Sequence, residues 1–135
     1  MTRKLTVLHT EASKGWGGQE IRILDESDGM RRRGHDVQIA AVGGTPLADA
    51  ARQRGIPFHA TPIDRRSFKA LSALRRVIKE IHPDVIVTHS STDSWVTAAA
   101  SLLRRRPAVV RVRQRIGDRL PDLDRLGDRE LLLLT

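Results

Sequence analysis

Apolar and polar residues follow two different periods along the first 113 residues. Runs of strand length, rich in β-branched and apolar residues, lie at 4–9, 36–42, 57–61, 84–90 and 108–113. Segments with the 3.6-residue period of a helix alternate with them, at about 18–33, 46–54, 68–81 and 92–103. This regular alternation predicts an α/β fold, a doubly wound, Rossmann-like parallel sheet of about five strands with helices on both faces.

The clearest helical signal is that of residues 68–81, where Ser67 is suited to the N-cap and Pro83 follows the last turn. The apolar residues of this segment share one helix face, so we expect all of them in the core: Phe68, Leu71, Leu74, Ile78 and Ile81. For the helix at 92–103, Ser91 or Thr92 is the expected N-cap. His35 and His82 are expected in surface turns.

Two loops at the predicted carboxyl ends of strands carry candidate chemistry. The first is the glycine-rich run from Gly15 to Glu20, where the backbone can approach a ligand and a helix N-terminus follows, an arrangement that suits a phosphate or carboxylate. It is not a dinucleotide fingerprint, because Glu20 occupies the position of the third glycine, and no P-loop occurs in the chain. A tight strand-to-helix turn is the alternative interpretation.

The second loop runs from Thr88 to Trp95 and contains His89, Asp93 and five hydroxyl side chains. Such a cluster suits a polyhydroxylated ligand, although a helix cap beside a hydrogen-bonded histidine explains it equally well. Arg66 follows the third strand. Arg111 and Arg113 alternate on the fifth, where they either meet an anionic acceptor or form a solvated basic edge.

Composition narrows the classes of function. The 24 basic and 16 acidic residues give a net charge of +8, which suggests anionic partners: nucleic acid, phosphorylated molecules or an acidic membrane surface. Nucleic acid is the weakest of these, since aromatic residues make up 3% of the chain and tyrosine is absent. The lack of cysteine excludes disulfides and thiolate chemistry, and no histidine spacing indicates a metal site. The longest apolar run is four leucines and no signal peptide is evident, so we expect a cytoplasmic protein.

Taken together, four sequence features resemble the N-terminal domain of retaining glycosyltransferases of family 4, which have the GT-B architecture. They are the Gly-Gly-x-Glu loop, the Arg-Gly-His-x-Val entry to the second strand, the helix that ends in His-Pro-Asp-Val-Ile, and the Thr-His-Ser-Ser-x-Asp-Ser-Trp stretch. The resemblance covers residues 3–113. It implies a protein that transfers a sugar from a nucleotide-sugar to a glycan or lipid-linked acceptor.

The resemblance also implies roles for single residues. His89 would be catalytic and lie near the transferred sugar. Four residues would contact the donor phosphates or the acceptor: Gly17, Gly18, Glu20 and Ser90. Four others would contact the acceptor: Arg66, Asp93, Arg111 and Arg113. The family generally needs no metal or other cofactor, because the nucleotide-sugar is a substrate, and many members contact anionic membranes from the cytoplasmic side.

The chain departs from the family after residue 113. Residues 114–135 are rich in Asp, Arg and Leu, with four arginines and five acidic residues, and do not continue the strand–helix pattern. We therefore expect an incomplete N-terminal domain at 1–113 and a divergent tail at 114–135. A shifted reading frame would explain this tail, as would a short helix that packs through Leu120, Leu123 and Leu126.

No donor-binding half is recognisable, so we expect the isolated chain not to be competent for transfer. Two alternatives remain open. One is a non-catalytic module that binds anions or glycans, or one chain of a split enzyme completed by a separately encoded C-terminal domain. The other is a fragment of a nucleotide-sugar epimerase.

Overall fold

The computed structural model describes residues 3–101 and 108–111, and these form a five-stranded parallel sheet flanked by four helices. In chain order the elements are β1 (Thr6–Glu11), α1 (Gly18–Arg32), β2 (Asp36–Ala41), α2 (Pro46–Gln53), β3 (Phe58–Ala60), α3 (Phe68–Ile81), β4 (Val85–Thr88), α4 (Ser91–Ser101) and β5 (Ala108–Arg111). The strand order is β3-β2-β1-β4-β5. The predicted doubly wound α/β fold is thus confirmed. None of the helices in these two ranges is long and apolar enough to cross a bilayer.

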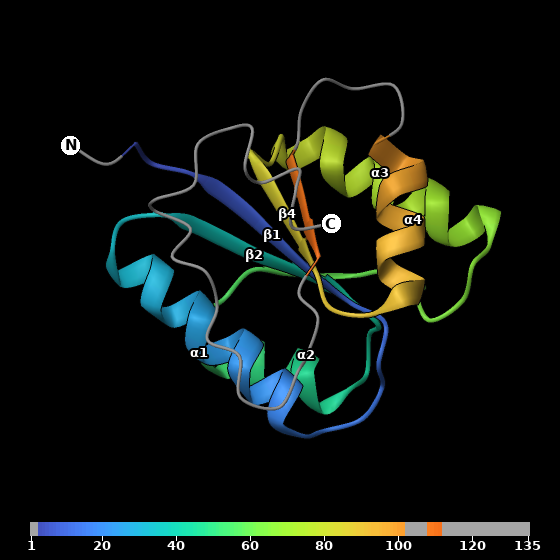
Figure 1. The fold of residues 1–135 in the computed structure, drawn as a ribbon. Coiled ribbons are helices and arrows are strands. Elements are labelled where there is room, and N and C mark those ends of the chain that lie inside the picture. The colour runs from blue at the N-terminus through green and yellow to red at the C-terminus, as the bar shows by residue number, and fades with distance from the viewer. Residues whose placement is uncertain (1–2, 102–107, 112–135) are drawn as a thin grey trace.

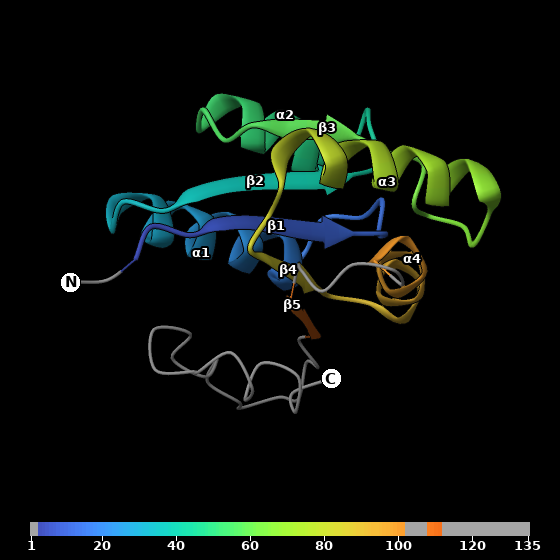
Figure 2. The same ribbon diagram turned by 90° about the horizontal axis from the view of Figure 1, so that it is seen from above.

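The helices cover both faces of the sheet, with α1 and α2 on one side and α3 and α4 on the other (Figure 1). Alternate strand residues serve the two sides, because successive side chains of a strand point to opposite faces. Leu8, Ala40 and Ile86 pack toward α3 and α4. On the other face, Ile39 packs with Ile23 and Leu24 of α1. Strands β1 and β2 lie side by side with their arrowheads pointing the same way (Figure 2).

The winding direction reverses between β1 and β4, which are neighbours in the sheet but 74 residues or more apart in the chain. The helix that follows β1 lies on one face, and the helix that follows β4 lies on the other. In open α/β sheets, ligands usually bind in the crevice outside the carboxyl ends of the two strands at such a reversal, which here are β1 and β4. This switch point is the part of the fold that positions the candidate site.

Local sequence determines the ends of α3 as predicted. The Ser67 hydroxyl accepts a hydrogen bond from the backbone N–H of Ala70, and His82 ends the helix in the left-handed conformation with φ 48°. One predicted core residue is wrong, however, since the Phe68 side chain is 89% exposed. Side chains at a helix N-terminus tilt away from the helix body, so that of Phe68 projects past the end of the packed face.

The prediction that His35 lies in a surface turn is also wrong, because its side chain is buried and its Nδ1 accepts a hydrogen bond from the backbone N–H of Leu5. The imidazole thereby satisfies a backbone donor at the start of β1. His82, by contrast, is exposed as expected. Strand β1 ends at Glu11, two residues later than the pattern indicates. Glu11 therefore belongs to the sheet and not to the loop.

Candidate functional site

Asp93 organises the centre of the switch point. Its carboxylate is fully buried and accepts hydrogen bonds from the Thr10 hydroxyl at 2.7 Å, from the backbone N–H of His89 at 2.9 Å and from the backbone N–H of Ser90 at 2.7 Å. The Ser90 hydroxyl is a fourth donor to it. Ser90 and Asp93 thus form a capping box at the start of α4. The N-cap is Ser90, not Ser91 or Thr92 as predicted.

This arrangement gives Asp93 a role in positioning. The hydrogen bond from Thr10 to the Asp93 carboxylate connects β1 to the start of α4. The hydrogen bond from the backbone N–H of His89 to the same carboxylate fixes the turn that carries His89. The Asp93 side chain has no exposed surface with which to contact an acceptor. The Asp93 side chain is therefore enclosed by the protein, whereas the Ser90 side chain is only half-buried.

The ring of His89 lies against that of His9, which comes from the middle of β1. His9 Nδ1 and His89 Nε2 are 3.0 Å apart, and the ring centroids are separated by 5.3 Å. Burial, assisted by the positive charge of Arg22, lowers the pKa of His9 to about 4. The pKa of His89 is lowered chiefly by burial, and further by His9 and Arg22. Both rings are consequently neutral at physiological pH.

Glu11 anchors the glycine-rich loop to the end of β1. Its buried carboxylate accepts hydrogen bonds from the backbone N–H of Ser13 at 2.9 Å and from the side-chain amide of Gln19. Burial raises the pKa of the Glu11 carboxyl, and its two hydrogen bonds oppose that rise in part. A second contact fixes the loop from outside, because Lys14 Nζ pairs with Asp64 at 2.9 Å.

The N-terminus of α1 is open. Gly17 is the N-cap residue and no side chain caps this end of the helix, so backbone N–H groups are available to an anion. Among the described residues, a Cβ atom built on Gly18 would meet nothing within 4 Å, and one on Gly17 would make only an ordinary contact with Glu20 at 3.6 Å. Packing among these residues therefore does not require the two glycines. The buried Glu20 in the first turn adds a negative charge beside this N-terminus.

The predicted acceptor-binding arginines have different outcomes. Arg66 is exposed, and its guanidinium lies 5.8 Å from the ring centroid of Trp95, which joins the loop after β3 to α4. Arg111 belongs to β5 opposite Thr88. The Arg111 side chain and all of Arg113 lie outside the described residues. Among the residues that are described, no three His, Cys, Asp or Glu side chains converge as a metal site would require.

Most of the predicted site residues thus come together at the carboxyl ends of β1 and β4. His89, Ser90 and Asp93 follow β4, while Gly17, Gly18 and Glu20 follow β1. The sequence places His9 at the end of the first predicted strand, where it could face the site, whereas Glu11 was not assigned to the site. Their only signal is position, since both lie toward the carboxyl end of the strand that precedes the glycine-rich loop.

A family model matches most of the chain. The model of the family described as "Glycosyl transferase 4-like domain" matches residues 17–132. This match extends past residue 113 and includes most of the region predicted to be a divergent tail, so the proposed boundary at 113 remains a prediction. No curated protein matches the sequence.

Several solved structures share this fold. A glycosyltransferase from Rickettsia africae superposes with a TM-score of 0.68 at 19% identity, over 80% of this chain and 29% of that one. MurG of Acinetobacter baumannii gives 0.63 at 17% identity, over 81% and 34%. HepE of Anabaena, in complex with UDP-glucose, gives 0.63 at 20% identity, over 79% and 28%. The chain thus spans about 30% of the length of these structures.

Removal of the Asp93 carboxylate should strongly destabilise the fold. Asp93→Ala leaves buried donors on Thr10, His89 and Ser90 without a partner, so we expect the free energy of unfolding to fall by about 3 kcal/mol or more. The control is Ser91→Ala, an exposed position at the same helix end, which should change stability by less than about 0.5 kcal/mol. Urea unfolding of the three proteins measures both changes. Equal losses in the two variants would contradict the capping box.

Glu11→Gln should change the pH dependence of stability. The pKa of Glu11 is raised in the folded state, so folding becomes less favourable as the pH rises above its ordinary value of 4.5 and the buried carboxyl must ionise. The variant cannot ionise there. We therefore expect its stability relative to the wild type to increase as the pH rises from 4.5 to 7.5, as measured by urea unfolding at intervals of half a pH unit. A constant difference across this range would contradict a raised pKa.

Proposed function

The chain belongs to the glycosyl transferase 4-like domain family, and on that premise we propose that it forms the acceptor-side half of a glycosyl transfer site. The reaction is the transfer of a sugar from a nucleotide-sugar to a glycan or lipid-linked acceptor. The family match over most of the chain is the observation that carries this proposal. Its location in the molecule rests on the crevice between β1 and β4, where the candidate residues gather.

Each side of the crevice suits a different part of the substrates. The uncapped N-terminus of α1, with Gly17 and Gly18 open in front of it, favours a negatively charged or strongly polar group. Glu20 lowers the positive potential there, which favours a sugar hydroxyl over a doubly charged phosphate. His89 and Ser90 lie on the turn after β4, which Asp93 fixes, and there His89 would contact the transferred sugar.

A second domain is part of the proposal. The chain spans about 30% of the length of the glycosyltransferases it resembles in fold, and transfer requires donor and acceptor to be held together in attack geometry, which can account for about 7–11 kcal/mol of the barrier. We propose that the second domain holds the nucleotide of the donor, that this half contacts the transferred sugar, and that the described half alone does not catalyse transfer. HepE binds UDP-glucose, so UDP-glucose is a reasonable first probe.

The test is to map the binding of UDP-glucose to the purified chain by amide chemical shifts. We expect changes in the amide shifts of Gly17, Gly18 and Ser90. We expect none at Gly55, which lies between α2 and β3, before the start of that strand. Gly18→Val should weaken this binding at least tenfold, because its side chain would occupy the space in front of the helix N-terminus. The absence of any shift at millimolar UDP-glucose would contradict a substrate site there.

The same mixtures, analysed for products, distinguish the alternative functions. The proposal predicts that UDP-glucose remains unchanged with the chain alone. Epimerised nucleotide-sugar in the absence of acceptor would instead identify an epimerase. Transfer of sugar to a lipid extract by the chain alone would refute the need for a second domain.

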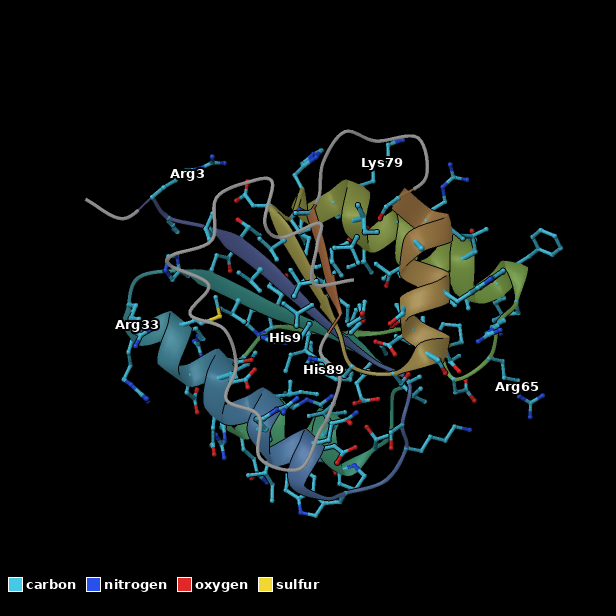
Figure 3. All side chains as sticks on the ribbon, viewed as in Figure 1. Arg3, His9, Arg33, Arg65, Lys79 and His89 are labelled. Carbon is cyan, nitrogen blue, oxygen red and sulfur yellow. The ribbon has the colours of Figure 1, made fainter. Side chains whose placement is uncertain are left out.

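The outer face of α3 supports contact with an anionic membrane. Its basic side chains are exposed, together with those of the loop before it: Arg65, Arg66, Lys69, Arg75, Arg76 and Lys79. Arg65 and Lys79 mark the two ends of this surface and point away from the sheet (Figure 3). The 89% exposed Phe68 lies within it and is suited to insertion at a lipid interface.

Vesicle sedimentation tests this contact. A basic residue near an anionic surface contributes about 1 kcal/mol of binding, so Arg75→Ser/Arg76→Ser should weaken binding to phosphatidylglycerol vesicles at least tenfold. Arg32→Ser/Arg52→Ser removes the same charge from the side of α1 and α2 and should have a smaller effect. Equal weakening by both double variants would show a response to net charge alone and would refute a specific surface on α3.

A further inference from the structure

The two buried histidines form a coupled pair at the centre of the site. His9 is 1% exposed and His89 is 6% exposed, and the two rings stack with an angle of 22° between their planes. Both lie on the α1 side of the sheet, where β1 and β4 run parallel to each other as neighbours (Figure 3). The inner nitrogens, His9 Nδ1 and His89 Nε2, share one hydrogen bond.

The proton count of this pair is constrained. Each neutral imidazole carries one N–H and one lone pair, and burial keeps both rings neutral. The shared bond uses one N–H and one lone pair. The outer nitrogens, His9 Nε2 and His89 Nδ1, therefore hold one N–H and one lone pair between them, and they cannot both donate or both accept.

A purely structural role explains the pair poorly. His9 Nε2 and His89 Nδ1 are buried and have no hydrogen-bond partner among the described residues. An apolar side chain at position 9 would fill the space without the unfavourable burial of an unpaired nitrogen. Arg22 of α1 is the charged residue that acts on both rings, and its positive charge further lowers the pKa of each imidazole. Asp93 contacts His89 through its backbone N–H and not through its ring. The His89 ring is hydrogen-bonded to His9 instead.

We propose that His9 is a positioning residue that fixes the orientation and tautomer of His89. If His9 Nδ1 carries the shared proton, His89 Nδ1 carries an N–H and is a donor. If His89 Nε2 carries it, His89 Nδ1 is an acceptor. The tautomer of His9 thus determines whether this buried nitrogen of His89 donates or accepts. The contact between the two rings is a property of the structure. That His89 acts on a sugar rests on the proposed function.

The test is to assign the tautomers from ring ¹⁵N chemical shifts in long-range ¹H–¹⁵N spectra of the chain without any ligand. In the wild type we expect one tautomer for each ring, with complementary shifts at the inner nitrogens. His9→Phe keeps the ring volume and removes the partner, so His89 should change to a mixture of tautomers. His9→Asn places an amide near the position of Nδ1 and should restore a single tautomer.

The control is His59→Phe, which removes a half-buried histidine whose Nε2 lies 2.6 Å from Gln38 near the β3 edge. It should leave the spectrum of His89 unchanged. Averaged tautomers in the wild type, or an unchanged His89 in His9→Phe, would overturn the proposal. If His9→Phe does not fold, the wild-type shifts and His9→Asn still decide the question. Because no donor is used, failure of UDP-glucose to bind would refute the proposed function and leave this result standing.

Discussion

The register between β1 and β4 decides which side chains can meet at the centre of this molecule. His9 lies opposite Val87, and Thr10 lies opposite Thr88, so the residue after β4 reaches the ring of His9. A slip of one residue would exchange the two faces of β1. His9 would then point toward α3 and α4, and Thr10 would lose Asp93. The hydrogen-bond ladder of two parallel strands is thus the condition for the two contacts that join β1 to the turn after β4, His9 with His89 and Thr10 with Asp93.

The polar groups at this junction are buried in three different ways. Asp93 is surrounded by hydrogen-bond donors from the backbone and from hydroxyl groups. The histidines are kept neutral by burial. The Glu11 carboxyl is buried at the end of β1, with a raised pKa and two hydrogen bonds that secure the glycine-rich loop. Apolar clusters on both faces of the sheet surround these groups, which places a preorganised polar region where the winding of the chain reverses.

Sequence patterns predicted much of the fold because its signals are local. The limits of α3 follow from the Ser67 cap and the apolar period, and both signals lie within residues 67–81. Exposure of Phe68 and burial of His35 depend on what lies beyond the element, so the pattern alone misplaced them. The His9–His89 contact joins residues 80 positions apart. Only the strand order and register bring them together, and a single sequence does not contain that information.

The most direct measurement is a crystal structure of the chain bound to UDP-glucose. The account predicts the sugar in the crevice between β1 and β4, with a hydroxyl at His89 and a polar group facing the backbone of Gly17 and Gly18. It also predicts that the stacked histidines keep their places. A ligand bound only elsewhere, with this crevice empty, would contradict a glycosyl transfer site at the junction of β1 and β4.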